Sequence, residues 1–201
     1  NLTEVHEIAD AVVLTWYPGE EGGHAVAAVL SGAYNPGAKL PITFPVSEAQ
    51  LPLVYNHKPT GRGDDYENLT GLPLFPFGYG LSYTTFEYSN LMIDKPTAKK
   101  GDNITVSFVV TNTGKLAGDE VAQLYLRDQI ASVARPVQAL KGFERIHLQP
   151  GASKTITLTL NPEDFEMLNE KMETVIEPGD FTVMIGSSSR DIRLKKTVTL
   201  Q

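Results

Sequence analysis

Cysteine is absent from this sequence of 201 residues. Without it the chain cannot form disulfides, thiolate nucleophiles or cysteine-ligated zinc sites. Basic residues are also scarce, since 17 lysines and arginines stand against 24 aspartates and glutamates and leave a formal net charge of -7. This balance argues against nucleic acid as a partner, because nucleic-acid-binding surfaces concentrate lysine and arginine.

Long hydrophobic runs are missing as well, and no apolar stretch approaches the roughly 18 residues of a membrane-spanning helix. We therefore expect no membrane partner. The four histidines are scattered and form no i, i+4 pair, so we expect no metal site and no cofactor. The remaining composition, with 41% hydrophobic and 20% charged residues, is that of an ordinary globular protein.

Residues 1–45 have an α/β pattern. Residues 12–14 form a continuous apolar run ending at Trp16 and Tyr17, as expected for a strand buried on both faces. Residues 24–30 place apolar side chains at helical spacing. A parallel strand needs a partner strand that this segment does not supply. We therefore expect the end of a larger α/β domain, with the remainder upstream or on a separate chain.

Residues 46–86 form a connector rich in proline, glycine, tyrosine and aspartate. A loop of this length is unusual inside a compact domain and is often functional. Its later part is aromatic, which predicts that it is packed down rather than loose. The aromatic residues are Phe75, Phe77, Tyr79, Tyr83 and Phe86.

Residues 87–201 change to an all-β pattern. ITVSFVVTNTG alternates, VAQLYLR alternates with the opposite residue type facing out, and SKTITLTL places Ile156, Leu158 and Leu160 on one face. Turn signals separate these runs at sandwich-like spacing. About seven strands in roughly 115 residues predict an immunoglobulin-like or fibronectin type III-like sandwich. The lack of a cysteine pair favours the fibronectin type.

The stretch WYPGEEGGHA is the first candidate for chemistry. A glycosidase needs two carboxylates about 5 to 9.5 Å apart with the substrate between them, which the adjacent Glu20 and Glu21 cannot provide. One of them could still be a single catalytic or sugar-binding group with a partner elsewhere. Alternatively, both acids favour the positive end of the following helix. The glycines match neither phosphate-loop motif and favour a tight strand-to-helix corner.

The second candidate is the connector sequence GRGDDYEN. Its Arg62, Asp64, Asp65 and Tyr66 combine charged and aromatic groups that suit sugar hydroxyls and ring faces. A solvated loop is the alternative interpretation. Residues 62–64 also spell a cell-adhesion tripeptide, which keeps an adhesion module open as a different class of function.

Three segments, in order, carry a family resemblance. WYPGEEGGHAVAAVLSGAYNPGAKLPITFP, PLFPFGYGLSYTTFEYSNL and the strands from VSFVVTNTG to EPGDFTVMIGSSS resemble the C-terminal part of a family 3 glycoside hydrolase, the β-glucosidase and β-xylosidase group. The first resembles the end of that family's α/β-sandwich domain, and the last its fibronectin type III-like module. The resemblance covers essentially all 201 residues.

The resemblance implies part of an exo-acting, retaining β-glycosidase that hydrolyses terminal β-linked sugars. It implies a nucleophilic Asp in an N-terminal barrel and an acid/base Glu upstream of PGEEGG, so it assigns no catalytic residue to this chain. The chain alone is expected to be inactive. The alternative is a stand-alone carbohydrate-binding or adhesion sandwich.

The expected partners are the remainder of the enzyme, on the same or a separate chain, and a β-linked glycoside or oligosaccharide. A second copy is also expected if the sandwich mediates dimerisation. The chain opens on the polar sequence NLTEVHE, so a leader peptide is expected upstream and not at residue 1. A secreted or periplasmic location is expected, with the cytoplasm as the alternative.

Overall fold

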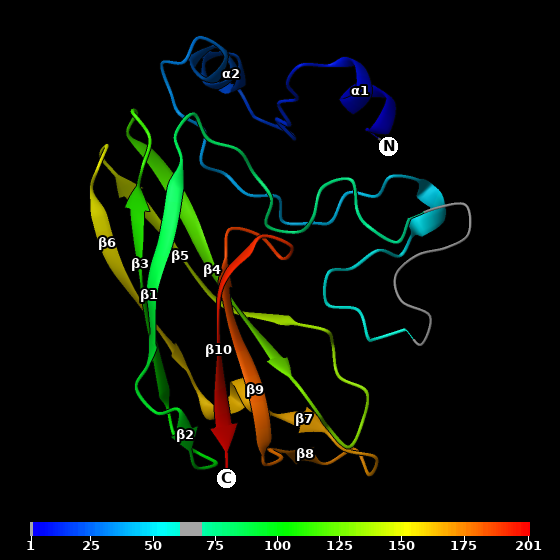
Figure 1. Cartoon of the computed structure of the whole chain (residues 1–201). Coiled ribbons are helices and arrows are strands. Elements are labelled where there is room, and N and C mark those ends of the chain that lie inside the picture. The colour runs from blue at the N-terminus through cyan, green and yellow to red at the C-terminus, as the bar shows by residue number, and fades with distance from the viewer. Residues whose placement is uncertain (1, 61–69) are drawn as a thin grey trace.

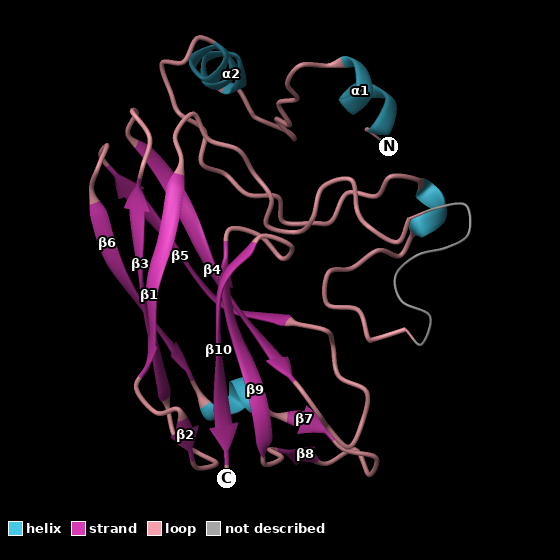
Figure 2. Ribbon diagram, viewed as in Figure 1, coloured by secondary structure: helices cyan, strands magenta, loops and turns pink. Residues whose placement is uncertain are grey.

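The computed structural model describes residues 2–60 and 70–201. A β-sandwich makes up most of it, and the helices α1 (Thr3–Ile8) and α2 (Gly22–Leu30) lie beyond the end of the sandwich that is opposite the C-terminus (Figure 1). The connector, with the short 3-10 helix η1 (Glu48–Gln50), runs between these helices and one side of the sandwich (Figure 2).

The sandwich consists of a three-stranded sheet in the order β1-β3-β6 and a five-stranded sheet in the order β2-β10-β9-β4-β5. All neighbours are antiparallel except β10 and β2. A small hairpin, β7-β8, and a second 3-10 helix, η2 (Pro162–Phe165), lie near the C-terminal end. The strands are β1 (Phe86–Ile93), β2 (Thr97–Ala98), β3 (Ile104–Asn112), β4 (Gly118–Asp128), β5 (Ala139–Leu148), β6 (Ser153–Leu160), β7 (Met167–Leu168), β8 (Thr174–Val175), β9 (Gly179–Gly186) and β10 (Ile192–Leu200).

Alternating side chains build the core between the two sheets. Every second residue of β3 is buried, and Phe108 lies opposite Ile156 of β6. Ile156 and Leu160 are fully buried and Leu158 packs against the core, as their spacing predicts. Each fully buried side chain of this size contributes about 1.5–3 kcal/mol, so alternation alone fixes the inward face of these strands.

Strand β4 departs from its predicted pattern because both of its faces are covered. Residues 122–126 are all buried, including Gln123 and Tyr125, which the alternation assigned to an outward face. The connector covers that face: the Tyr55 ring lies edge-on to Tyr125 at 5.8 Å and stacks on Phe77 at 4.3 Å. Residues 122–126 of β4 are therefore shielded from solvent on both faces of the five-stranded sheet.

The connector aromatics pack as the sequence predicts, with one exception. Phe75 stacks on Tyr79 with ring centroids 5.3 Å apart, and its backbone forms a bridge with Phe44. Tyr83 is the exception, because about half of its surface is exposed. The connector is thus a packed layer over the sandwich in the part of it that the structure describes.

The predicted strand at residues 12–14 is wrong for this chain. The segment is irregular, its side chains are exposed, and within residues 2–60 and 70–201 no strand pairs with it. A strand buried on both faces needs hydrogen-bonded neighbours, and no described strand lies beside this segment. The helix predicted at residues 24–30 is confirmed as α2, which begins two residues earlier.

Candidate functional site

The corner, residues 18–23, joins the irregular segment to α2. Gly22 is the one buried residue of this helix. A Cβ atom there would lie 2.6 Å from Cγ of Pro18, closer than real side chains approach. The Gly22 amide also donates to the Gly19 carbonyl at 3.2 Å. The proline and the glycine pair therefore form a tight turn, as the sequence predicts.

The two acids of the corner point into solvent. Glu21 immediately precedes α2, and its carboxylate lies 2.7 Å from Nδ1 of His24, with both side chains largely exposed. Glu20 is exposed on the same turn. Within the described ranges no group of three acidic or histidine side chains could hold a metal ion. Two neighbouring acids on one turn can bind one side of a sugar, but cannot act from opposite sides of a bond.

Trp16 stands at the entrance to the corner in a strained backbone conformation, with φ at 53°. Bulky residues rarely adopt this region, and such strain is concentrated at functional sites. Its ring lies edge-on to Phe44 at 6.2 Å, and Phe44 in turn lies edge-on to Phe75. The side chain of the next residue, Tyr17, is fully exposed. This aromatic row ties the corner to the connector.

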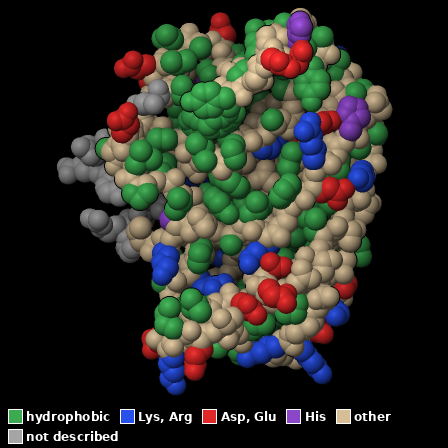
Figure 3. Space-filling view, turned by 180° about the vertical axis from the view of Figure 1, so that it is seen from behind, with side chains coloured by type: hydrophobic (Ala, Val, Ile, Leu, Met, Phe, Trp, Pro, Cys, Tyr) green, Lys and Arg blue, Asp and Glu red, His purple; other side chains and the backbone are tan. Residues whose placement is uncertain are grey.

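An apolar surface surrounds the corner. We call it the N-terminal apolar face, and Figure 3 shows hydrophobic side chains gathered over the upper half of the molecule. Contiguous exposed apolar surface of this kind marks an interaction site in a soluble protein. Its large exposed residues are Ile8, Val12, Val13, Leu14, Trp16, Tyr17 and Leu30.

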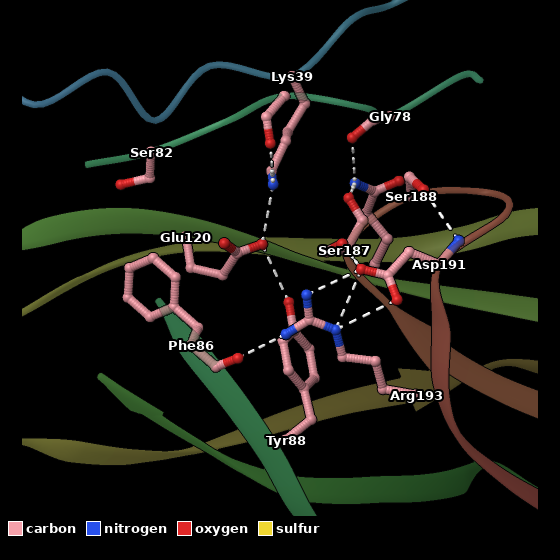
Figure 4. A network of polar contacts seen from close by, with 12 residues as sticks. Lys39, Gly78, Ser82, Phe86, Tyr88, Glu120, Ser187, Ser188, Asp191 and Arg193 are labelled. Carbon is pink, nitrogen blue, oxygen red and sulfur yellow. Dashed lines mark hydrogen bonds and ion pairs between the residues drawn. The ribbon is translucent and has the colours of Figure 1, made fainter. Parts of the chain in front are cut away.

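A junction holds the segment after α2 against the sandwich. Nζ of Lys39 lies 3.1 Å from the carboxylate of Glu120, which is only 4% exposed. The hydroxyl of Tyr88 donates to the same carboxylate at 3.0 Å. Figure 4 shows Lys39 reaching this carboxylate from the opposite side to Tyr88. Removing one partner of such a buried pair strands the other charge, which is strongly destabilising.

A second layer of the network surrounds Tyr88. The guanidinium of Arg193 lies 4.9 Å from the Tyr88 ring centroid and donates to the Phe86 carbonyl at 2.6 Å (Figure 4). Burial, reinforced by Glu120, raises the pKa of Tyr88 far above its usual value, so the hydroxyl stays protonated and can donate. Hydrogen bonds from Arg193 hold the pKa of Asp191 below its usual range. The network is built for support, because its polar groups are already satisfied by one another.

A cavity of about 380 Å³ lies between the connector and the outer face of the five-stranded sheet. Tyr55, His57 and Gln138 line it together with the cations Arg127 and Lys195. None of its described lining residues is acidic. The described part of the cavity lining therefore supplies none of the carboxylates that glycoside hydrolysis requires.

The structure places two of the site residues that the sequence predicts, and the other four lie outside the described residues. Glu20 and Glu21 share the corner, and no other described acidic side chain joins them. Arg62, Asp64, Asp65 and Tyr66 lie outside the described residues. The pairing of Lys39 with Glu120 is not predictable from the sequence, because no local pattern distinguishes one buried acid among 24 acidic residues. The polar position of Glu120 at the start of a buried strand was the one available signal.

None of the helices in the part of the chain that the structure describes has the length and hydropathy of a membrane span.

Two family models match the chain. The glycosyl hydrolase family 3 C-terminal domain matches residues 1–83, and the fibronectin type III-like domain matches residues 120–189. These matches and the sandwich agree with the predicted fold class.

Named relatives match along nearly the whole chain. A periplasmic beta-glucosidase from Salmonella typhimurium is 45% identical over 96% of this chain and 26% of its own length. A beta-xylosidase from Formosa agariphila is 44% identical over 100% of this chain and 28% of its own length. The crystal structure of a beta-glucosidase from Listeria innocua in complex with glucose superposes with a TM-score of 0.94, at 38% identity, over 99% of this chain and 29% of that one. The chain thus spans about a quarter of the length of these relatives.

Proposed function

The chain belongs to glycoside hydrolase family 3 and corresponds to the C-terminal part of its members, and from this premise we propose that it completes a retaining β-glycosidase acting on terminal β-linked sugars. The observation that carries the proposal is the near-complete match to enzymes named beta-glucosidase and beta-xylosidase. The alternative of a stand-alone binding or adhesion module is not favoured, because these relatives are enzymes of which the chain covers only a part.

The N-terminal apolar face is where the rest of the enzyme packs in this proposal. The side chains of residues 12–14 are apolar, and the backbone of this segment pairs with no described strand. Both features suit a strand position in a larger sheet. Burying such surface is favourable by about 25 cal/mol per Å². The remaining α/β domain, on the same polypeptide or a separate one, is the partner that supplies the neighbouring strands.

The chemistry divides between the two parts of the enzyme. Retaining hydrolysis requires two carboxyl groups about 5–5.5 Å apart, one as nucleophile and one as acid/base. The adjacent Glu20 and Glu21 cannot provide such a pair, and in this proposal both groups come from the remainder of the enzyme. In open α/β sheets ligands bind at the carboxyl ends of strands. The corner follows residues 12–14, which take a strand position in the complete sheet in this proposal. Glu20 and Glu21 line the pocket side in this proposal, together with the loop that carries Arg62, Asp64, Asp65 and Tyr66.

The sandwich braces the α/β part through the junction, and it is also the surface through which a homodimer would form. Export to the periplasm or beyond the cell fits the Salmonella relative, which is named as periplasmic. Fractionation of the source cells tests the location, and sedimentation of the complete enzyme tests the dimer. Recovery of the activity in the cytoplasm, or a monomer at micromolar concentration, would contradict these two assignments.

Complementation tests the proposed function. Residues 1–201 are mixed or co-expressed with the polypeptide that precedes them in the complete enzyme, and hydrolysis of aryl β-glucosides and β-xylosides is followed. We expect no turnover from residues 1–201 alone and turnover with anomeric retention from the complex. A well-folded complex that hydrolyses neither substrate would contradict the proposal.

Variants of the complemented enzyme test the substrate-side residues. Glu21→Gln, Arg62→Ala and Tyr66→Ala should each raise KM more than they lower kcat, because they remove binding that is common to substrate and transition state. Unchanged kinetics in all three would remove the corner and the loop from the substrate site.

A further inference from the structure

Helix α2 is attached to the rest of the described chain by few apolar contacts. Gly22 is its one buried residue, and Leu30 is exposed at its far end. Val26, Ala28 and Val29 are only half-buried, so this short helix has little packing of its own to fix its direction relative to the sandwich. Its placement therefore depends on the polar contacts at its C-terminal end.

Asn35 joins three segments at this end. Its Nδ2 donates to the carbonyl of Ala117, just before β4, at 2.8 Å. Its Oδ1 accepts from the hydroxyl of Ser82 at 2.9 Å and from the backbone amide of Tyr83 at 2.7 Å. One side chain thus links the turn after α2, the entry of β4 and the end of the connector.

Tyr83 closes the link to the helix itself. Its hydroxyl donates to the carbonyl of Val29, in the last turn of α2, at 2.9 Å. The same carbonyl also accepts from the backbone amide of Gly32 at 3.0 Å, so the Tyr83 hydroxyl adds a second hydrogen bond to the C-terminal end of the helix. Tyr83 thus donates its backbone amide to Asn35 and its hydroxyl to α2, so the two residues act on the helix as one unit.

The segment after α2 and the start of β4 are packed so closely that neither can shift along the other. A Cβ atom on Gly118 would lie 2.6 Å from Nδ2 of Asn35, and one on Gly37 would lie 2.6 Å from Cβ of Asp119. The buried pair of Lys39 and Glu120 fixes the following residues of the same segment. The segment after α2 is consequently anchored on β4 at successive points.

We propose that Asn35 and Tyr83 are positioning residues that hold the corner, through α2, in a fixed orientation on the sandwich. Because α2 begins at the corner, a rotation of the helix about its anchored end displaces Glu20 and Glu21. The effect on catalysis rests on the proposed function, in which the corner lines the substrate pocket. The orientation itself is a property of this chain.

A full-length polypeptide that carries this chain provides the test, with Asn35→Ala as the main variant. Asn169→Ala is the matched control, because Asn169 also makes three side-chain hydrogen bonds but lies beside the β7-β8 hairpin at the other end of the sandwich. Hydrogen exchange by mass spectrometry reports on residues 16–30, and steady-state kinetics on an aryl β-glycoside report on the pocket.

We expect Asn35→Ala to speed exchange in peptides from α2 by about tenfold while peptides from β3 and β6 stay unchanged. KM should rise about three- to tenfold with kcat per active site within about twofold. Loss of folded enzyme would instead lower the active-site count at constant KM. Tyr83→Phe removes only the bond to α2 and should give a smaller change in the same direction, which covers the case in which Asn35→Ala does not fold.

The outcomes separate this proposal from the proposed function. If the wild-type polypeptide hydrolyses no β-glycoside, the function fails, and the exchange data still decide the positioning role. If it is active but exchange and KM are unchanged in both variants, the positioning role is overturned while the function stands. Equal effects from Asn35→Ala and Asn169→Ala would also overturn it, since they would show a general loss of stability.

Discussion

Asp119 and Glu120 are neighbours on β4, and their side chains point to opposite faces of the sheet. Glu120 is buried and meets Lys39 and Tyr88. Asp119 lies on the other face, where Nε of Arg145 donates to it at 2.8 Å and Nδ1 of His147 lies 2.6 Å away. Two adjacent acids of one strand thus stabilise the fold in different ways, one by a buried pair and one by a half-exposed pair.

Asp119→Asn should flatten the acid side of the stability profile. Burial alone would raise the pKa of Asp119, but hydrogen bonds from His147 and Arg145 outweigh it and hold the pKa below the ordinary value of 3.8. A depressed folded pKa stabilises the fold above the unfolded pKa, and this contribution is lost as pH falls through the folded one.

We therefore expect Asp119→Asn to cost about 1 kcal/mol near neutral pH, a modest figure because Arg145 and His147 are half-exposed and screened by solvent. The difference from the wild type should shrink as pH falls below 3.8. Urea unfolding between neutral pH and pH 3 measures it, and a difference that stays constant with pH would show that the carboxylate's charge is not involved.

At the scale of elements, β4 organises the molecule because it is covered on both faces. Nε2 of Gln123 donates to the carbonyls of Gly78 at 3.2 Å and Ser187 at 2.7 Å, which joins the connector to the end of β9. The Tyr125 hydroxyl donates to Oε1 of the same Gln123. The polar side chain is satisfied and its burial is therefore tolerated.

Gly78→Ala should loosen the connector from β4. Gly78 has φ at 80°, and a Cβ there would lie 2.1 Å from Oε1 of Gln123, which is already held by its own hydrogen bonds. Gly151→Ala is the matched control, because Gly151 has φ at 76° with open space around it.

Both substitutions carry the backbone cost of about 1 kcal/mol that alanine incurs at positive φ. Gly78→Ala should add about 1–3 kcal/mol for the collision. Thermal unfolding of the two variants, followed by circular dichroism, separates the terms. Equal destabilisation would mean that Gln123 moves aside freely, and the tight docking of the connector would then be wrong.

The strands of the sandwich were predictable because apolar and polar residues alternate within each strand, as Ile156 and Leu160 of β6 show. Alternation reports which residues share a face but not what covers it, so the burial of Gln123 and Tyr125 was missed. The strand at residues 12–14 failed for the related reason that strand formation depends on neighbours outside the segment.

The candidate site was predictable only where the signal is local. The glycine pair and Pro18 predict a tight corner, and the structure has one. The contacts of Asn35 with Ala117 and Ser82, like that of Lys39 with Glu120, join residues far apart in the sequence. Polar residues at such positions look like ordinary surface residues until the fold brings their partners together.

At the scale of the whole molecule, the two ends differ in polarity. The N-terminal apolar face lies at the helical end, and Figure 3 shows more hydrophobic side chains over that half of the molecule than over the lower half. A net charge of -7 causes electrostatic repulsion between copies in solution, but it does not shield an apolar surface from water. The exposed apolar side chains at the helical end therefore suit the packing against the rest of the enzyme that we propose.

Residues 1–201 alone should bind a hydrophobic dye such as anilinonaphthalene sulfonate at this face. The double variant Ile8→Ser, Tyr17→Ser should bind markedly less, because it removes two highly exposed apolar side chains. Phe143→Ser, at an exposed position of β5, is the control and should change little. Fluorescence titration measures the difference, and equal loss in both variants would place the dye elsewhere.

The covering of β4 by the connector has a consequence for exchange of modules between related enzymes. A chimaera that receives only the sandwich, cut just before β1, would expose Tyr125 and Gln123 to solvent. It would also separate Lys39 from the Glu120 carboxylate. A transplanted sandwich must therefore carry the whole segment from residue 34 to residue 85 with it, whatever the family boundaries suggest. The same constraint predicts that the sandwich and the segment that covers it are exchanged between enzymes only as one unit.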